Sequence, residues 1–367
     1  MKLLLIVHAI KGGGAERVAV NLANKFVSEG HYVSLSCDTT HPFSYAVDER
    51  IKVFNHREYC EDTPFWSKFA WYRFVRMEKN IRNYSKDFRP DFVISFMTKI
   101  NIDVILALMG SGIPVIATEH TNVSKIAGKF NKLLYNKVYP FATAITVLTR
   151  FDYKRWHCKF KNLIYMPNPI VIEEDSHIYQ SNCRKKVVLT AGRVDAWYVK
   201  GFDNLIKAWS MISHKHPGWE LHIAGNSDAQ SIEYLLSLTK NEARESIKFL
   251  GFRNDINKLM SESKVYVLTS RWEGLPMSLL EAMNMGCCCL AFDVETGPSD
   301  IIKDGVNGML VKNQNVEDLA NKLSLLMSDE TLVNQLSQKA HEGVLKFGDD
   351  YIVDRWYKLF ELINKKK

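Results

Sequence analysis

The feature that most constrains the fold of this chain is a regular alternation of short apolar runs with longer amphipathic stretches. In the first half the runs predict strands at 3–8, 32–36, 92–96, 114–118, 144–148 and 163–166. The pattern restarts at "KVVLTAGR" and predicts strands at 187–191, 219–224, 247–250, 265–269, 287–292 and 308–311. Strands that alternate with helices form parallel sheets. The sequence therefore predicts an α/β protein with two doubly wound, Rossmann-like domains.

The segment between the two patterns predicts where the domains meet. Residues 166–186 combine prolines with polar and charged residues, which is typical of an exposed linker. We predict an N-terminal domain at 1–170, a C-terminal domain at 171–350, and a final helix at 351–367 that packs on another surface. A length of 367 residues agrees with two hydrophobic cores. Two such sheets facing each other would place the carboxyl ends of their strands around one cleft.

The charge of the chain is distributed unevenly. Residues 1–170 hold 24 Lys and Arg against 14 Asp and Glu, whereas residues 171–367 hold 24 against 27. The basic first half predicts an anionic partner, which could be a membrane surface, a diphosphate or a nucleic acid.

Two further features bear on the compartment. The apolar run at 3–10 leads directly into "KGGGAER" without a cleavage site, so we predict a buried strand rather than a signal peptide. The cysteines are seven in number, three of them consecutive, and match neither a disulfide framework nor a metal site. We expect a cytoplasmic protein.

A glycine-rich turn follows the first strand. In "KGGGAER" the backbone can approach a ligand closely at the start of a helix, which suits a phosphate or diphosphate. The spacing lacks the third glycine of a dinucleotide fingerprint and the Lys-Ser/Thr of a P-loop. A tight strand-to-helix turn with no ligand is the alternative.

Two cations follow the first strand of the second half. In "AGRVDAWYVKGFDNL", Arg193 leaves the strand and Lys200 stands just before the next helix. Cations at the carboxyl edge of a sheet can hold a diphosphate and neutralise its charge as it departs. A solvated loop is the alternative for Arg and Lys taken alone.

Two carboxylates flank a predicted helix start in "SRWEGLPMSLLEAMNMG". Glu273 lies in the loop and can accept a hydrogen bond from a sugar hydroxyl. Glu281 lies on the helix and can accept two hydrogen bonds from vicinal hydroxyls, as on a ribose. Pro276 is a favourable first-turn residue, and the N–H groups of Gly274 and Leu275 could face phosphate oxygens there. The two carboxylates would then bracket a diphosphate.

These motifs resemble a known family. Glu273 and Glu281 match the E-x7-E motif of retaining glycosyltransferases of family 4, which have the GT-B fold. The resemblance extends over "GGGAERV", "SFMTKINI", "TEHTN", "PNPI", "GRVDAWYVKG", "HIAG" and "GPSDIIKDGVNGMLV", and so over nearly the whole chain. "SFMTKIN", "EHTN" and "GPSDII" further resemble bacterial enzymes that add GalNAc or related hexoses to lipid-linked oligosaccharides and surface polysaccharides.

The resemblance implies a role for each matched residue. It implies a UDP-sugar donor bound by the C-terminal domain and a lipid-linked or polysaccharide glycan acceptor bound by the N-terminal domain. It also implies a final helix that crosses back to the first domain. The catalytic residues would be His120, Arg193, Lys200 and Glu273. The donor-binding residues would be Gly13, Gly14, Arg193, Lys200, Gly225, Glu273, Gly274, Leu275, Pro276 and Glu281. The aromatic insertion "AWY" before Lys200 departs from the family pattern.

The sequence also bears on cofactors and on other classes of function. No D-x-D motif occurs, so we expect no cofactor and no catalytic metal, and the protein's cations would carry the leaving-group charge. A nicotinamide-dependent oxidoreductase would need the missing glycine and a ribose acid. A non-catalytic carbohydrate- or lipid-binding relic would be expected to lose a cation or a glutamate. For His120 the alternative is a hydrogen-bonded structural histidine.

A basic and aromatic stretch in the first half predicts membrane contact. Residues 65–87 hold six Lys and Arg against two acidic residues, with aromatic residues between them. Helices of this composition lie at lipid interfaces, so we predict docking on the inner face of an anionic membrane through Lys68, Trp71, Arg73, Arg76 and Lys79. A helix that buries its aromatics in the core is the alternative. Nothing resembles a base-reading module, so no nucleic acid is expected.

Overall fold

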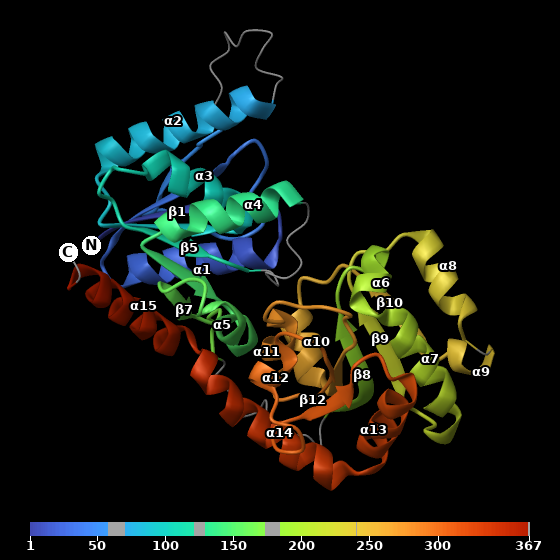
Figure 1. Ribbon diagram of the computed structural model, residues 1–367. Helices are drawn as coiled ribbons and strands as arrows, with labels where there is room; N and C mark the ends of the chain where they lie inside the picture. Colours follow the sequence, from blue (N-terminus) through green and yellow to red (C-terminus); the bar gives the residue numbers. More distant parts are fainter. Residues whose placement is uncertain (58–69, 121–128, 173–183, 240, 366–367) are drawn as a thin grey trace. The chain divides into compact units, whose positions relative to one another are not determined.

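The computed structural model describes residues 1–57, 70–120, 129–172, 184–239 and 241–365 (Figure 1). The chain divides into two compact units. Unit 1 contains Met1–Pro169 and Asp349–Lys367, and unit 2 contains Ile170–Gly348. Both are α/β units with a parallel sheet, as the alternation predicted.

Unit 1 is built on a seven-stranded parallel sheet with the order β3-β2-β1-β4-β5-β6-β7. Its strands are β1 (Lys2–Ala9), β2 (Tyr32–Asp38), β3 (Lys52–Phe54), β4 (Phe92–Phe96), β5 (Val115–Thr118), β6 (Ala144–Val147) and β7 (Leu163–Tyr165). The strand order reverses between β1 and β4, and ligands of such sheets bind at the carboxyl ends beside this point. The sequence missed β3 because its three residues are too short to show an apolar run.

Helices cover both faces of this sheet (Figure 1). They are α1 (Gly14–Ser28), α2 (Ala70–Phe88), α3 (Thr98–Leu108), α4 (Lys129–Val138), the 3-10 helix η3 (Tyr139–Phe141), α5 (Arg150–Trp156) and α15 (Asp349–Asn364). Side chains of α2, α3 and α4 share one core with β1, β4, β5 and β6. α1 and α15 lie on the opposite face.

The last helix is part of the first unit although it is remote in sequence. Phe360 of α15 stacks on Phe92 of β4 with ring centroids 4.4 Å apart. The hydroxyl of Tyr357 lies 3.0 Å from Nε2 of His31, and Lys25 of α1 pairs with Asp350. The apolar periodicity at 351–367 therefore corresponds to a helix that closes one face of unit 1.

Unit 2 is built on a six-stranded parallel sheet with the order β10-β9-β8-β11-β12-β13. Its strands are β8 (Lys185–Ala191), β9 (Glu220–Ala224), β10 (Ile247–Gly251), β11 (Ser263–Leu268), β12 (Cys288–Asp293) and β13 (Met309–Lys312). Its helices are η6 (Val194–Ala196), α6 (Trp197–Lys200), α7 (Phe202–Ile212), η7 (Ser213–Lys215), α8 (Ala229–Ser237), α9 (Asn241–Arg244), α10 (Ile256–Glu262), α11 (Met277–Asn284), α12 (Pro298–Ile301), α13 (Val316–Ser328), α14 (Glu330–Val344) and η8 (Leu345–Phe347).

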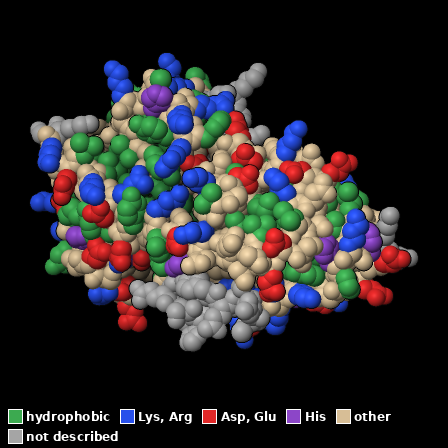
Figure 2. All heavy atoms as spheres, turned by 90° about the horizontal axis from the view of Figure 1, so that it is seen from below, with side chains coloured by type: hydrophobic (Ala, Val, Ile, Leu, Met, Phe, Trp, Pro, Cys, Tyr) green, Lys and Arg blue, Asp and Glu red, His purple; other side chains and the backbone are tan. Residues whose placement is uncertain are grey.

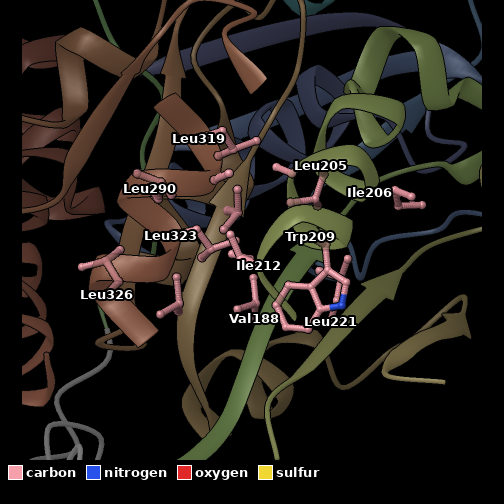
Figure 3. Packing of buried hydrophobic residues seen from close by; sticks show 14 of the residues in the cluster. Val188, Leu205, Ile206, Trp209, Ile212, Leu221, Leu290, Leu319, Leu323 and Leu326 are labelled. Carbon is pink, nitrogen blue, oxygen red and sulfur yellow. The ribbon is translucent and has the colours of Figure 1, made fainter. Parts of the chain in front are cut away.

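The core of unit 2 lies between its sheet and two helices that contact each other, α7 and α13 (Figure 3). Trp209 is fully buried there against aliphatic side chains of the sheet, and its indole N–H donates to Ser246 Oγ at 2.9 Å. The three consecutive cysteines enter β12 and are fully buried, so they fill the core as small apolar groups.

The predicted exposed linker at 166–186 is wrong at both ends. Residues 166–170 are buried, and the N–H of Ile170 donates to the Phe347 carbonyl at 2.9 Å. Lys185 and Lys186 already belong to β8. The prolines prevent a regular element here, but they do not prevent an irregular segment from packing. Residues 173–183 lie outside the described residues.

Candidate active site

An ion pair spans the point of unit 2 where its strand order reverses. Lys200 ends the short helix after β8, and Glu273 lies in the loop after β11, the neighbouring strand. Nζ of Lys200 lies 2.9 Å from Oε1 of Glu273, and the side chains are 29% and 15% exposed. The sequence predicted both residues as site residues, and the structure brings them into direct contact.

Glycines hold the Lys200 side chain in place. Gly201 has a φ of +66°, and a Cβ there would lie 1.8 Å from the carbonyl oxygen of Thr269. The Thr269 hydroxyl donates to the Lys200 carbonyl at 2.9 Å, so the two segments cross closely. A Cβ on Gly192 would lie 3.2 Å from the Lys200 side-chain carbons. The lysine stem therefore lies over the Gly192 backbone, which directs its ammonium toward Glu273.

The loop that carries Glu273 is held by a neighbouring loop after β12. The Thr296 hydroxyl donates to the Glu273 carbonyl. A Cβ on Gly297 would lie 2.2 Å from the Gly274 carbonyl oxygen, so only glycine fits beneath this turn. Leu275 is buried, and Pro276 caps α11 rather than standing inside its first turn.

Arg271 is a structural residue of this site that the sequence analysis missed. Its guanidinium makes two hydrogen bonds of 2.8 Å to the buried Asp203 carboxylate and lies 4.1 Å from the ring centroid of Tyr198. Its backbone N–H donates to the Val199 carbonyl at 2.9 Å. Arg271 therefore joins the segment before Lys200 to the segment before Glu273. The sequence signal was the position of each charge, two or three residues from a predicted site residue.

Glu281 lies on α11 and is buried, so its carboxylate is not solvated as a surface carboxylate would be. It lies near Tyr266 of β11, whose hydroxyl pKa is raised mainly by burial and also by the charges of Cys289 and Glu281. A buried carboxylate is costly unless it is satisfied by donors. Its place on the second turn of α11 agrees with the predicted position.

Arg193 and Gly225 follow adjacent strands, β8 and β9, at the same sheet edge. The Arg193 side chain is 70% exposed, and its Nε lies 3.5 Å from Asp195. Gly225 has a φ of +152°, and a Cβ there would lie 1.8 Å from the Gly192 carbonyl oxygen. Gly225 therefore permits close approach of two loops, whereas Arg193 presents its charge to solvent.

His120 follows β5 at the carboxyl edge of unit 1. Its ring stacks on Phe96 with centroids 5.3 Å apart, and its Nε2 lies 3.1 Å from the Thr118 hydroxyl. Burial lowers the pKa of His120 to about 3. The imidazole is therefore neutral at physiological pH. These contacts agree with the structural alternative, and the role of His120 in catalysis stays a prediction.

A buried polar network lies directly beneath His120, and the sequence analysis did not identify it. The Glu119 carboxylate accepts hydrogen bonds from Thr98 at 2.8 Å, from Asn101 at 3.2 Å and from the Tyr139 hydroxyl. Burial raises the pKa of Glu119 to about 8, against the hydrogen bonds from Thr98 and Asn101, which lower it. The network ties β5 to α3 and η3, so it fixes the backbone from which His120 projects.

The glycine turn after β1 differs from the predicted phosphate loop. The backbone N–H groups of Lys11 and Gly13 both donate to the Glu16 carboxylate, at 2.5 and 3.1 Å. Gly13 caps α1, and Gly14 is its first residue. The Gly13 amide is therefore occupied by the helix's own glutamate, and donor binding by Gly13 and Gly14 stays a prediction.

Only part of the predicted membrane segment can be placed. Lys68 lies outside the described residues, and for Trp71, Arg73 and Arg76 the structure gives the helical backbone of α2 alone. Lys79 is exposed. Farther along α2, Met77 and Ile81 pack in the core of unit 1, as the alternative of a core-covering helix requires.

Comparison with known proteins identifies the family. Residues 12–174 match the model described as Glycosyltransferase Family 4, and residues 171–343 match Glycosyl transferases group 1. The amylovoran biosynthesis glycosyltransferase AmsD of Erwinia amylovora is 30% identical over 97% of this chain and 98% of its own length. The chain belongs to the family 4 glycosyltransferases.

Other relatives of this glycosyltransferase agree with the assignment. An α-1,4-N-acetyl-D-galactosaminyltransferase of Campylobacter jejuni, named for an undecaprenol-linked saccharide, is 28% identical over 98% of each chain. The crystal structure of HepE from Anabaena in complex with UDP matches with a TM-score of 0.79 and 18% identity, over 98% of this chain and all of that one. The structural likeness establishes the GT-B fold. The protein is an enzyme of the glycosyltransferase class.

Proposed function

We propose that this glycosyltransferase moves a hexose or N-acetylhexosamine from a UDP-sugar to a lipid-linked or polysaccharide glycan acceptor, with retention at the anomeric carbon. The observation that carries the proposal is the Lys200–Glu273 pair at the reversal point of unit 2. The proposal assigns the Lys200 ammonium to the diphosphate and the neighbouring Glu273 carboxylate to a hydroxyl of the donor sugar. The names of the relatives support the substrate classes, because HepE was solved with UDP and the Campylobacter jejuni enzyme acts on an undecaprenol-linked glycan.

The side-chain chemistry of the pair supports both roles at once. An ammonium group has three donors and a carboxylate has two oxygens, so one contact between them leaves further donors for phosphate and an oxygen for a hydroxyl. Arg193 adds an exposed guanidinium at the same edge. The buried Glu281 carboxylate would accept from the two ribose hydroxyls.

The proposed reaction breaks the bond between the anomeric carbon and the diphosphate oxygen while the acceptor oxygen attacks the same face. The acceptor proton passes to the departing phosphate, and UDP leaves. Lys200 and Arg193 stabilise the charge that develops on the diphosphate. His120 is neutral at physiological pH and would contribute a hydrogen bond rather than a charge to the donor sugar.

A donor screen tests the proposal. The protein should respond to one of UDP-GalNAc, UDP-GlcNAc, UDP-Gal and UDP-Glc in preference to GDP-mannose. The response is slow hydrolysis of that sugar nucleotide or thermal stabilisation of the protein by it. We propose that no metal is needed, so hydrolysis should continue in EDTA. Lack of any response to the four UDP-sugars would overturn the donor assignment. Loss of activity in EDTA that magnesium or manganese restores would overturn the metal-free mechanism.

Glu281→Ala is expected to weaken UDP binding by about 1–3 kcal/mol, because a buried acceptor of hydrogen bonds is lost. Calorimetric titration of UDP measures the change. Glu273→Gln is the matched comparison, since its partner is the sugar, and it should lower turnover more than UDP affinity. If the two variants lose equal UDP affinity, the division of roles between the glutamates is wrong.

We also propose that the enzyme associates peripherally with the anionic inner face of the cell membrane. The basic excess of residues 1–170 supports this docking, and Lys79, Arg82 and Lys86 lie exposed on α2. No described helix is long and apolar enough to cross a membrane. On the face seen in Figure 2, basic and acidic side chains occur together.

Flotation with vesicles tests the membrane prediction. The protein should bind anionic vesicles at low salt and dissociate as salt rises, because each basic residue near the surface contributes about 1 kcal/mol that salt screens. Replacing Lys68, Arg73, Arg76 and Lys79 together by Gln should abolish binding.

A charge-matched variant provides the control for flotation. Replacing four exposed lysines elsewhere in unit 1, Lys137, Lys154, Lys159 and Lys161, removes the same charge and should leave most of the binding. Equal loss in both variants would show that net charge, and not the 65–87 segment, attracts the membrane.

A further inference from the structure

Four aromatic side chains form a row beside the candidate active site of unit 2. Trp197 and Tyr198 begin α6, Tyr234 lies on α8, and Trp272 directly precedes Glu273 in the loop after β11. From Tyr234 through Trp197 and Tyr198 to Trp272, the ring centroids of successive members are 4.5, 5.9 and 6.2 Å apart. We call these four residues the aromatic shelf. Trp197 and Tyr198 belong to the "AWY" insertion that departs from the family pattern.

The aromatic shelf is open to the solvent although its side chains are large. Tyr198, Tyr234 and Trp272 are 54%, 43% and 39% exposed. Neighbouring exposed apolar side chains of this size mark a surface that binds a partner or a ligand. The residues assigned to the donor do not account for these rings, so the aromatic shelf needs a partner of its own.

Contacts with the rest of unit 2 hold the rings in place. Trp197 packs partly against the core of the unit. The ring of Tyr198 lies 4.1 Å from Cζ of Arg271, whose guanidinium is fixed by its two hydrogen bonds to Asp203. A surface that is rigid before binding loses little conformational freedom when a partner arrives. The aromatic shelf is therefore preorganised to bind through the faces and edges of its rings.

The charges beside the aromatic shelf indicate a neutral partner. The cations closest to it in sequence each pair with a carboxylate, and the pairs are Arg193–Asp195, Lys200–Glu273 and Arg271–Asp203. Helix α8 adds the exposed Glu233 next to Tyr234. An anionic lipid surface requires an excess of positive charge, which these pairs do not supply. A partner that binds here must be held mainly by its apolar surface.

A sugar ring has a neutral surface that complements an aromatic ring. One face of a pyranose carries C–H groups, and the face of an aromatic ring has the negative potential that attracts such hydrogens. The hydroxyl groups of the sugar lie at its edges, where they stay solvated. The aromatic shelf is also continuous with the candidate active site, because Trp272 is bonded to Glu273 and Tyr198 is two residues before Lys200.

We propose that the aromatic shelf binds the glycan chain of the acceptor by stacking with its pyranose rings. The proposal rests on the proposed glycosyltransfer and adds to it that the acceptor is an oligosaccharide rather than a single sugar. It gives unit 2 a carbohydrate-binding surface that is separate from the residues assigned to the donor. Other glycosyl transfer reactions must then build the earlier part of the glycan before this enzyme acts.

Titration with soluble saccharides tests the aromatic shelf. The probes are tetrasaccharides of GalNAc, GlcNAc, Gal and Glc and the corresponding monosaccharides, and calorimetry and tryptophan fluorescence measure their binding. At least one tetrasaccharide should bind the wild type about tenfold more tightly than its monosaccharide, because it reaches more than one ring. Tyr234→Leu and Trp272→Leu should each weaken this binding about tenfold, since leucine is apolar but has no ring face.

Two further variants serve as controls. Tyr234→Phe keeps the ring and removes only the hydroxyl, so it should retain the affinity of the wild type. Tyr32 is 72% exposed at the start of β2 in unit 1, and Tyr32→Leu should leave saccharide binding unchanged. Thermal melting checks that each variant is folded, and Tyr234→Leu carries the test if Trp272→Leu fails to fold.

The outcomes distinguish a glycan from the other partners of an aromatic surface. A tetrasaccharide affinity that is no higher than that of the monosaccharide, or that is unchanged in both leucine variants, would overturn the proposal. Loss of UDP affinity in these variants in place of saccharide affinity would show that the rings hold the uracil base. Loss of vesicle flotation with saccharide binding intact would show a lipid contact, and either result would also overturn the proposal. Lack of any response to the UDP-sugars by the wild type would instead count against the proposed function.

Discussion

Lys200→Ala is expected to lower turnover about a hundredfold or more while the protein stays folded. The size follows from the loss of one preorganised group that stabilises developing charge in a catalytic site. Two features of the structure strengthen the expectation. The lysine stem is held over Gly192, and the side chain is only 29% exposed, so its position is set before a ligand arrives. Its removal would also leave the Glu273 carboxylate unpaired beside a diphosphate, which adds repulsion. Arg193→Ala should act in the same direction, since it removes the other cation at this edge.

Steady-state hydrolysis of the preferred UDP-sugar measures the effect. Lys185→Ala is the control, because Lys185 begins β8 at the opposite end and pairs with Glu262 at 2.5 Å. It should keep turnover within a few-fold of the wild type, as expected for an exposed ion pair. Turnover of Lys200→Ala within tenfold of the wild type would show that the ion pair with Glu273 is structural and that the diphosphate is held elsewhere.

Gly201→Ala is expected to destabilise unit 2 by roughly 2–4 kcal/mol, the sum of an overpacking cost and the cost of a positive φ for a residue with a Cβ. The new methyl group would lie 1.8 Å from the Thr269 carbonyl oxygen, so the segment that carries Lys200 or the segment after β11 must move. The same contact positions the backbone of Lys200. The activity of Gly201→Ala should therefore fall by more than the decrease in the amount of folded protein explains. Thermal and denaturant unfolding measure the stability change.

Gly218→Ala separates the two contributions to that cost. Gly218 has a φ of +80°, and a Cβ there would meet no atom within 4 Å. It should cost only about 1 kcal/mol, from the backbone conformation alone. Equal destabilisation by the two variants would mean that the close crossing at Thr269 relaxes easily and does not position Lys200.

The sequence by itself determined the helices and strands and the positions of the candidate donor residues. Apolar runs indicate local burial, and each predicted strand is present in one of the two sheets. Turn residues report local backbone geometry, so Gly192, Gly201 and Gly297 mark loops at the carboxyl edge. The E-x7-E motif carried family information, and it identified Glu273 and Glu281 before any contact was known.

Only the tertiary structure decided which of these residues meet. Lys200 and Glu273 are 73 residues apart and touch because β8 and β11 are neighbours, and strand order leaves no trace in the local pattern of either strand. The same reason explains why the sequence did not predict the Arg271–Asp203 pair or the network around Glu119. A buried charge has the same sequence signature as an exposed one, because its burial depends on what distant segments place over it. The capture of the Gly13 amide by Glu16 was also undecided, since a glycine turn that binds a ligand and one that caps its own helix share the same letters.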